Sequence, residues 1–148
     1  TTVHGEAELV LLRTRGFHPW GQLAKPRHGH LAVPLDGTHA LLLGGHAGGN
    51  YLDSVEIFAG TAMRGFPLPV KLRLQRAHFT VTPLSAGGFL IVGGLGPDNP
   101  AHQPEVLTAA GSIPVRPVPS RAPSLEAVSL GVDEVLLFAP YCQFRYRK

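Results

Sequence analysis

Hydrophobic positions in this chain form short runs bounded by turn residues, and no segment carries a 3.6-residue period over three turns. The run Ala40–Leu43 is apolar throughout, which is typical of a strand covered on both faces. Asp36-Gly37 just before it indicates a hairpin turn. The pattern predicts an all-β chain with less than about 10% helix. Between residues 27 and 75 it places strands at 31–35, 40–43 and 54–58, with a weaker fourth at 65–68.

The same pattern returns 49 residues further along the chain. With this shift, Leu41-Leu42-Leu43-Gly44-Gly45 becomes Leu90-Ile91-Val92-Gly93-Gly94, while Arg27 becomes Arg76 and Glu56 becomes Glu105. A weaker copy begins at Arg121, with strands expected at 125–130 and 135–138. We therefore read residues 1–148 as a single domain made of late strands at 1–26, whole repeats at 27–75 and 76–120, and early strands at 121–148.

These features carry a resemblance to the Kelch repeat, whose period is about 50 residues. The matching residues are Arg27-x-x-His30, Gly44-Gly45, Val55-Glu56-Ile57-Phe58, Arg76-x-His78, Gly93-Gly94 and Glu105. The chain departs from the pattern in two ways: the late-repeat tryptophan occurs only as Trp20, and the third copy lacks its double glycine. The resemblance implies Kelch-type blades of a β-propeller, each a four-stranded antiparallel sheet.

The number of repeats predicts an incomplete ring in one chain. Propellers typically have four to eight blades, and 148 residues at 49 per repeat supply about three. We expect the ring to be completed by a missing chain segment or by another copy, and we favour the first. Open ends would leave apolar sheet faces bare, and we assign to them Leu41, Leu43, Leu136 and Phe138.

Composition and charge exclude several classes of partner. The net charge is only +3 and the basic residues are scattered, apart from a tail at 145–148 that we expect to be a solvated end, so we expect no nucleic-acid partner. No apolar run approaches the roughly 18 residues of a membrane span, so we expect a soluble chain without a membrane partner, with the cytoplasm slightly favoured. The single Cys142 allows no intrachain disulfide and is interpreted as a buried small hydrophobe.

Catalytic and metal chemistry finds little support in the sequence. We expect His28 and His30 to share a strand face, and a third metal ligand is suggested by residue type alone among His39, His46, His78 and His102. No zinc spacing occurs, so we expect no metal and no cofactor. There is no Gly-x-Ser-x-Gly elbow, and the glycine-rich segment 44–49 lacks the Lys-Ser/Thr of a phosphate loop. We assign no catalytic residue.

Protein binding is the function that the sequence favours. In the propellers that the chain resembles, the loops after the second strands share one face with the links between blades and usually form the binding surface. Here those loops are 46–52 and 95–103, which we expect to be unstructured, and Arg27 and Arg76 recur once per repeat as anion contacts or, as we favour, as ties between blades. We predict a non-catalytic interaction scaffold for a protein partner, whether peptide or domain. The alternatives are part of a Kelch enzyme of the oxidase or sugar-acid epimerase type, and a structural propeller appended to another enzyme. The candidate binding residues are His46, Asn50, Tyr51, Asp98, Asn99, His102, Arg27 and Arg76.

Overall fold

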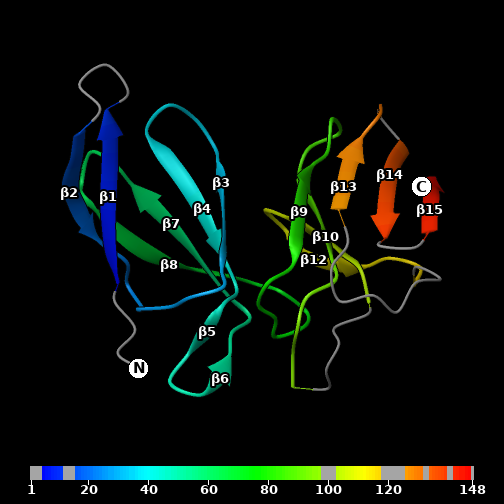
Figure 1. Ribbon diagram of the computed structural model, residues 1–148, viewed down its shortest axis with the longest axis horizontal. Helices are drawn as coiled ribbons and strands as arrows, with labels where there is room; N and C mark the ends of the chain where they lie inside the picture. The colour runs from blue at the N-terminus through cyan, green and yellow to red at the C-terminus, as the bar shows by residue number, and fades with distance from the viewer. Residues whose placement is uncertain are drawn as a thin grey trace.

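The computed structural model describes residues 5–11, 16–97, 103–117, 126–131, 134–139 and 142–147. These residues form strands β1 to β15 and contain no helix, which confirms the predicted all-β class. It follows that none of them belongs to a helix able to cross a membrane. The sheets follow one another along the long axis of the molecule (Figure 1).

The first sheet has the strand order β1-β2-β8-β7-β4-β3. Its neighbours pair antiparallel, except that β2 meets β8 in a parallel sense through the single pair Gln22↔Arg64. The antiparallel pair β1–β2 thus adjoins β8, the outer strand of the first whole repeat. The fourth strand of that repeat, expected only at 65–68, is much longer. The bounds are β1 Glu6–Leu11, β2 Gly16–Gln22, β3 Leu31–Pro34, β4 His39–Leu43, β7 Ser54–Ala59 and β8 Arg64–Lys71.

The turn between β3 and β4 is a hairpin, as predicted, but it is longer than a two-residue Asp-Gly turn. It spans residues 35–38, and Leu35 N–H donates to His39 O at 2.9 Å. The Asp36 carboxylate accepts hydrogen bonds from the backbone N–H groups of Thr38 (2.7 Å) and His39 (2.8 Å). These bonds, the one from Thr38 first, lower the pKa of Asp36 to about 2. The aspartate therefore closes the turn by side-chain capping.

Two smaller sheets follow. The second has the order β12-β11-β10-β9 and is antiparallel throughout, and the third has the order β13-β14-β15. Strand β15 includes residues 145–147 of the basic tail and pairs with β14. Its signal is the period-two alternation Cys142-Gln143-Phe144-Arg145-Tyr146-Arg147. The bounds are β9 Thr80–Pro83, β10 Phe89–Val92, β11 Glu105–Thr108, β12 Gly111–Pro114, β13 Glu126–Ser129, β14 Glu134–Ala139 and β15 Cys142–Arg147.

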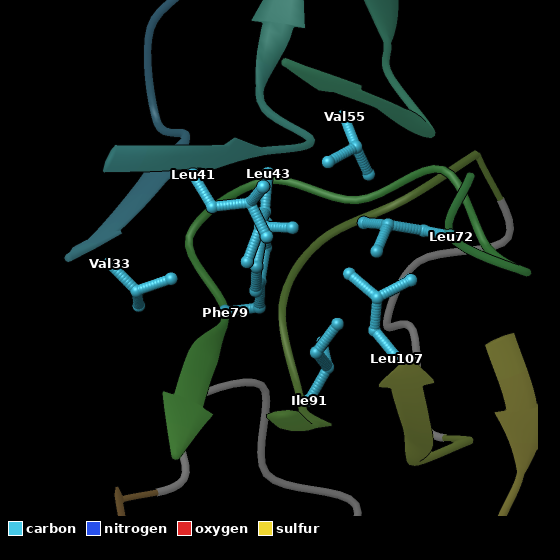
Figure 2. Packing of buried hydrophobic residues seen from close by; sticks show 8 residues of the cluster. All are labelled: Val33, Leu41, Leu43, Val55, Leu72, Phe79, Ile91 and Leu107. Carbon is cyan, nitrogen blue, oxygen red and sulfur yellow. The ribbon is translucent and has the colours of Figure 1, made fainter. Parts of the chain in front are cut away.

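Strand β10 lies at the centre of the hydrophobic core because both of its faces are covered. Ile91 packs toward the first sheet, in the cluster shown in Figure 2, which contains Val33, Leu41, Leu43, Val55, Leu72, Phe79, Ile91 and Leu107. Leu90 and Val92, on the opposite face of β10, pack against Val135 and Leu137 of β14. The apolar run of a central strand therefore holds adjacent sheets together on either side, as strand alternation requires.

This packing corrects one expectation about exposed faces. Leu41 and Leu43 were assigned to a bare end of the assembly, but they are buried between the first and second sheets. The expectation of an uncovered face agrees better with β14. Its residues Val135 and Leu137 face the second sheet, whereas Leu136 and Phe138 alternate with them and are only half-buried. Sequence could not tell which apolar face of β4 meets the next sheet, since both faces are apolar.

Candidate functional site

Arg27 and Arg76 occupy equivalent positions, and both are buried. Each guanidinium donates to the carbonyl oxygen of the glycine that ends the second strand: Arg27 to Gly44 at 2.9 Å and Arg76 to Gly93 at 3.0 Å. Their side chains are 1% and 0% exposed, respectively. Guanidinium groups so enclosed cannot meet an anion in solution. The anion-contact interpretation of these two residues is therefore wrong. The favoured alternative, ties between blades, needs correction as well, because the side-chain bonds join strands within one sheet: β4 to β7 for Arg27 and β10 to β11 for Arg76.

Each arginine is paired with a buried glutamate 29 residues ahead. Arg27 bonds to Glu56, and Arg76 bonds to Glu105 at 2.8 Å. Burial lowers the pKa of both arginines, and the neighbouring glutamate opposes that shift. The second carboxylate oxygen of Glu105, Oε2, accepts hydrogen bonds from the backbone N–H of Arg73 (2.6 Å) and from the Ser112 hydroxyl. Charge and these hydrogen bonds thus compensate the burial of the pair, except that Arg76 Nε has no partner among the described residues.

The backbone bonds at the strand ends repeat with the same offset. His28 and His46 exchange N–H···O bonds of 3.0 and 2.8 Å, and 49 residues later Ala77 and Leu95 exchange two bonds of 2.8 Å. Gly44 and Gly93 adopt φ values of 55° and 70°, which L side chains avoid. The interval of 49 read from the sequence is therefore also the interval of the hydrogen-bond framework.

The loop after β4 is a small hairpin, although we expected residues 46–52 to be unstructured. Strands β5 (His46–Ala47) and β6 (Asn50–Tyr51) pair through His46↔Tyr51 and Ala47↔Asn50. The hairpin extends from the end of β4 (Figure 1), and Gly48 and Gly49 form its turn. It brings the predicted binding residues His46, Asn50 and Tyr51 together. The other predicted residues of this face, Asp98, Asn99 and His102, lie outside the described residues.

Rings from separate segments gather at this hairpin. The imidazole centroids of His28 and His46 are 4.9 Å apart, and Tyr51 meets His46 edge-on at 5.0 Å. The exposed His78 ring lies 6.5 Å from that of His28. His78 holds a φ of 56°, a left-handed backbone conformation that is uncommon for a residue other than glycine. We call His28, His46, Tyr51 and His78 the ring cluster.

The positions of His28 and His30 differ from the prediction that they share a strand face. β3 begins only at Leu31, and Gly29 between the two histidines has a φ of 62°, which breaks the alternation. His28 is exposed in the ring cluster, whereas His30 is half-buried under Gly45. Burial, followed by the positive charge of Arg27, lowers the pKa of His30. Its Nδ1 atom is buried without a hydrogen-bond partner among the described residues.

Sequence reasoning did not place His28 and His78 in the candidate binding surface. A comparison of the repeats would have suggested His28 and His46, because the equivalent positions 49 residues later hold Ala77 and Leu95. The first bridge thus carries two imidazoles where the second, with the same pair of backbone bonds, carries apolar side chains. At His78 the unusual residue is in the second repeat. Its counterpart in the first repeat is Gly29, and glycine is the residue expected at a positive φ.

A separate hollow of about 600 Å³ lies at the other end of the first sheet. It collects apolar side chains from the β3–β4 and β7–β8 turns, together with Trp20 from β2. The bonded pair of His39 Nδ1 and Asp36 Oδ2, 3.0 Å apart, lies at this hollow. Its lining consists of Trp20, Pro34, Asp36, Gly37, Thr38, His39, Ala40, Phe58, Gly60, Thr61 and Met63.

Comparison with known proteins adds no identity: no family model matches the chain, and no curated protein matches its sequence. The ring cluster therefore has to be interpreted by its own chemistry. It offers aromatic surface, imidazole donors and acceptors and a tyrosine at the end of a rigid framework, a combination suited to binding.

Proposed function

We propose that this chain is a Kelch-type propeller segment that serves as a non-catalytic protein-binding module. The framework that repeats every 49 residues supports this proposal, together with the four-stranded antiparallel second sheet and the face-to-face packing of successive sheets. A closed ring would need sheets beyond those described, whether from another copy or from further chain.

One observation carries the assignment of the binding surface. The repeats share their buried arginine–glutamate framework, yet within the described residues the bridge of the first carries two imidazoles beside a hairpin, with Tyr51 next to them, where the second has Ala77 and Leu95. Because buried ties already maintain the fold, these outer rings are available for recognition. Tyr and His present an apolar body with a polar edge, which suits a peptide or domain surface. The partner would be a protein that contacts the ring cluster.

The test is a quantitative capture experiment with matched variants. Wild type, Tyr51→Ala and His46→Ala are immobilised alongside His39→Ala, which removes an imidazole at the opposite end of the same sheet. We expect at least one partner to be retained by wild type and His39→Ala and to be lost with both ring-cluster variants. A partner set identical across all four proteins, each with a normal circular dichroism melt, would overturn the assignment.

A further inference from the structure

The contact between His28 and His46 has the dimensions of a metal chelate. His28 Nε2 and His46 Nδ1 are 3.2 Å apart and share a hydrogen bond in which one ring donates its N–H to the other, and the ring centroids are 4.9 Å apart. With Zn–N bonds of about 2.05 Å and tetrahedral angles, two imidazole nitrogens lie roughly 3.3 Å apart and their ring centroids about 5.2 Å apart. Both distances are close to those observed. Binding an ion would replace the hydrogen bond: the donor imidazole would move its proton to its other ring nitrogen, and small rotations would then turn both lone pairs toward a common point.

The backbone fixes this separation in advance. His28 and His46 are directly opposed residues that exchange both N–H···O bonds, so their side chains leave the bridge on the same side. Buried contacts secure each segment: Arg27, next to His28, is tied to Glu56, and Gly45, next to His46, donates to Arg76 O at 2.8 Å. Little conformational freedom would be lost on binding, which favours affinity.

We propose that His28 and His46 bind a divalent transition-metal ion of the zinc class. No group of three or more histidine, cysteine or carboxylate side chains is arranged to hold a metal ion in the described part of the chain. The ion would therefore have two protein ligands, with water or a group from a bound partner at the open positions. His78, whose ring is 6.5 Å from that of His28, is the nearest imidazole available as a third ligand after rotation of its side chain.

This site is independent of the proposed protein binding, because an ion can bind whether or not a partner does. The second repeat provides an internal control. Its equivalent bridge holds Ala77 and Leu95, with the same pair of backbone bonds and no imidazole. Any metal affinity due to the two imidazoles should therefore appear at the first bridge and not at the second, where Ala77 is also fully buried.

Calorimetric titration of the full chain with zinc chloride near pH 7.5 tests the proposal. We expect one ion per chain and release of the ion at acidic pH, because protons compete for the imidazoles. His28→Ala and His46→Ala should each weaken binding at least about tenfold, since loss of a ligand costs no less than loss of a second-shell partner. His39→Ala should bind as wild type does.

Nuclear magnetic resonance of the histidine rings needs only the wild-type chain, so it tests the proposal even if a variant fails to fold. Zinc should shift the signals of His28 Nε2 and His46 Nδ1 more than those of His39 or His18. Absence of zinc binding by the folded chain would overturn the proposal. So would unchanged affinity in a folded His28→Ala/His46→Ala double variant, or zinc shifts confined to other histidines.

Discussion

The two whole repeats share a buried arginine–glutamate framework and differ in the residues beside it: His28 is exposed and His30 half-buried, whereas their counterparts Ala77 and Phe79 are buried. With a shift of 49 residues, the bonds of Arg27 to Gly44 and Glu56 become those of Arg76 to Gly93 and Glu105. The positions that differ surround the β5–β6 hairpin, where the replacements are His28 by Ala77, Gly29 by His78, His30 by Phe79 and His46 by Leu95. The hydrogen bonds between arginine, glutamate and glycine therefore define the repeat. The residue types beside them can differ between repeats without disturbing these bonds.

Removing one partner of a buried ion pair should have the largest effect on stability. Glu105→Gln leaves the Arg76 charge uncompensated, and loss of a buried partner typically costs about 3–5 kcal/mol. Glu56→Gln should cost a similar amount if the repeats share one framework, as urea unfolding can measure. The control is Asp53→Asn, whose exposed pair with Lys71 spans 3.8 Å and should contribute no more than about 1 kcal/mol. A loss confined to one glutamate would break the equivalence of the repeats.

The double glycines should come next. Gly44 combines a φ of 55° with close packing, because a Cβ there would lie 2.6 Å from Arg76 O. We expect Gly44→Val to destabilise the fold by about 1–3 kcal/mol, and Gly93→Val, at a φ of 70°, to do the same. Gly48→Ala should cost less, because a φ of 58° strains it but nothing lies within 4 Å of an added Cβ. Equal thermal midpoints for these variants would contradict the assignment of the tight strand ends.

A third prediction concerns the stability of the fold in acid. His30 of the first repeat should lower it, whereas its counterpart in the second repeat, Phe79, has no group to titrate. The lowered pKa of His30 means that the unfolded chain takes up its proton more readily than the folded chain. Its contribution to stability is therefore present above about pH 6.5 and is lost as the pH falls below that value. His30→Phe copies Phe79 and removes a buried nitrogen without a described partner.

Thermal melts at pH 7.5 and pH 5.0 can check this prediction. We expect the midpoint of His30→Phe to fall less on acidification than that of wild type, and its stability at neutral pH to be equal or higher. Matching losses in the two proteins would show that His30 does not titrate against the fold.

The sequence predicted those strands that can be recognised from the residue types within the strand itself. The apolar runs and double glycines located β4 and β10 to within a residue, because burial on both faces and positive φ each demand particular residue types. The pairing of Arg27 with Glu56 was missed, although both residues recur together, because spacing alone does not show that two side chains meet. The ring cluster was found in part, through His46 and Tyr51. His28 and His78 come from other segments, and only the fold brings them near.

The smallest expected effect on stability concerns His78 of the second repeat, whose counterpart in the first repeat is Gly29. A left-handed φ costs an L-residue roughly 1–2 kcal/mol, whereas glycine adopts it freely but loses more entropy on folding. His78→Gly should therefore change the free energy of unfolding by less than about 1 kcal/mol, in the stabilising direction, as denaturant titration can resolve. His78→Ala separates the two contributions, because it keeps the strained backbone while removing the ring near His28. If glycine proved less stable than alanine, the ring cluster would not be storing strain at this position, and His78 would no longer mark a functional departure between the repeats.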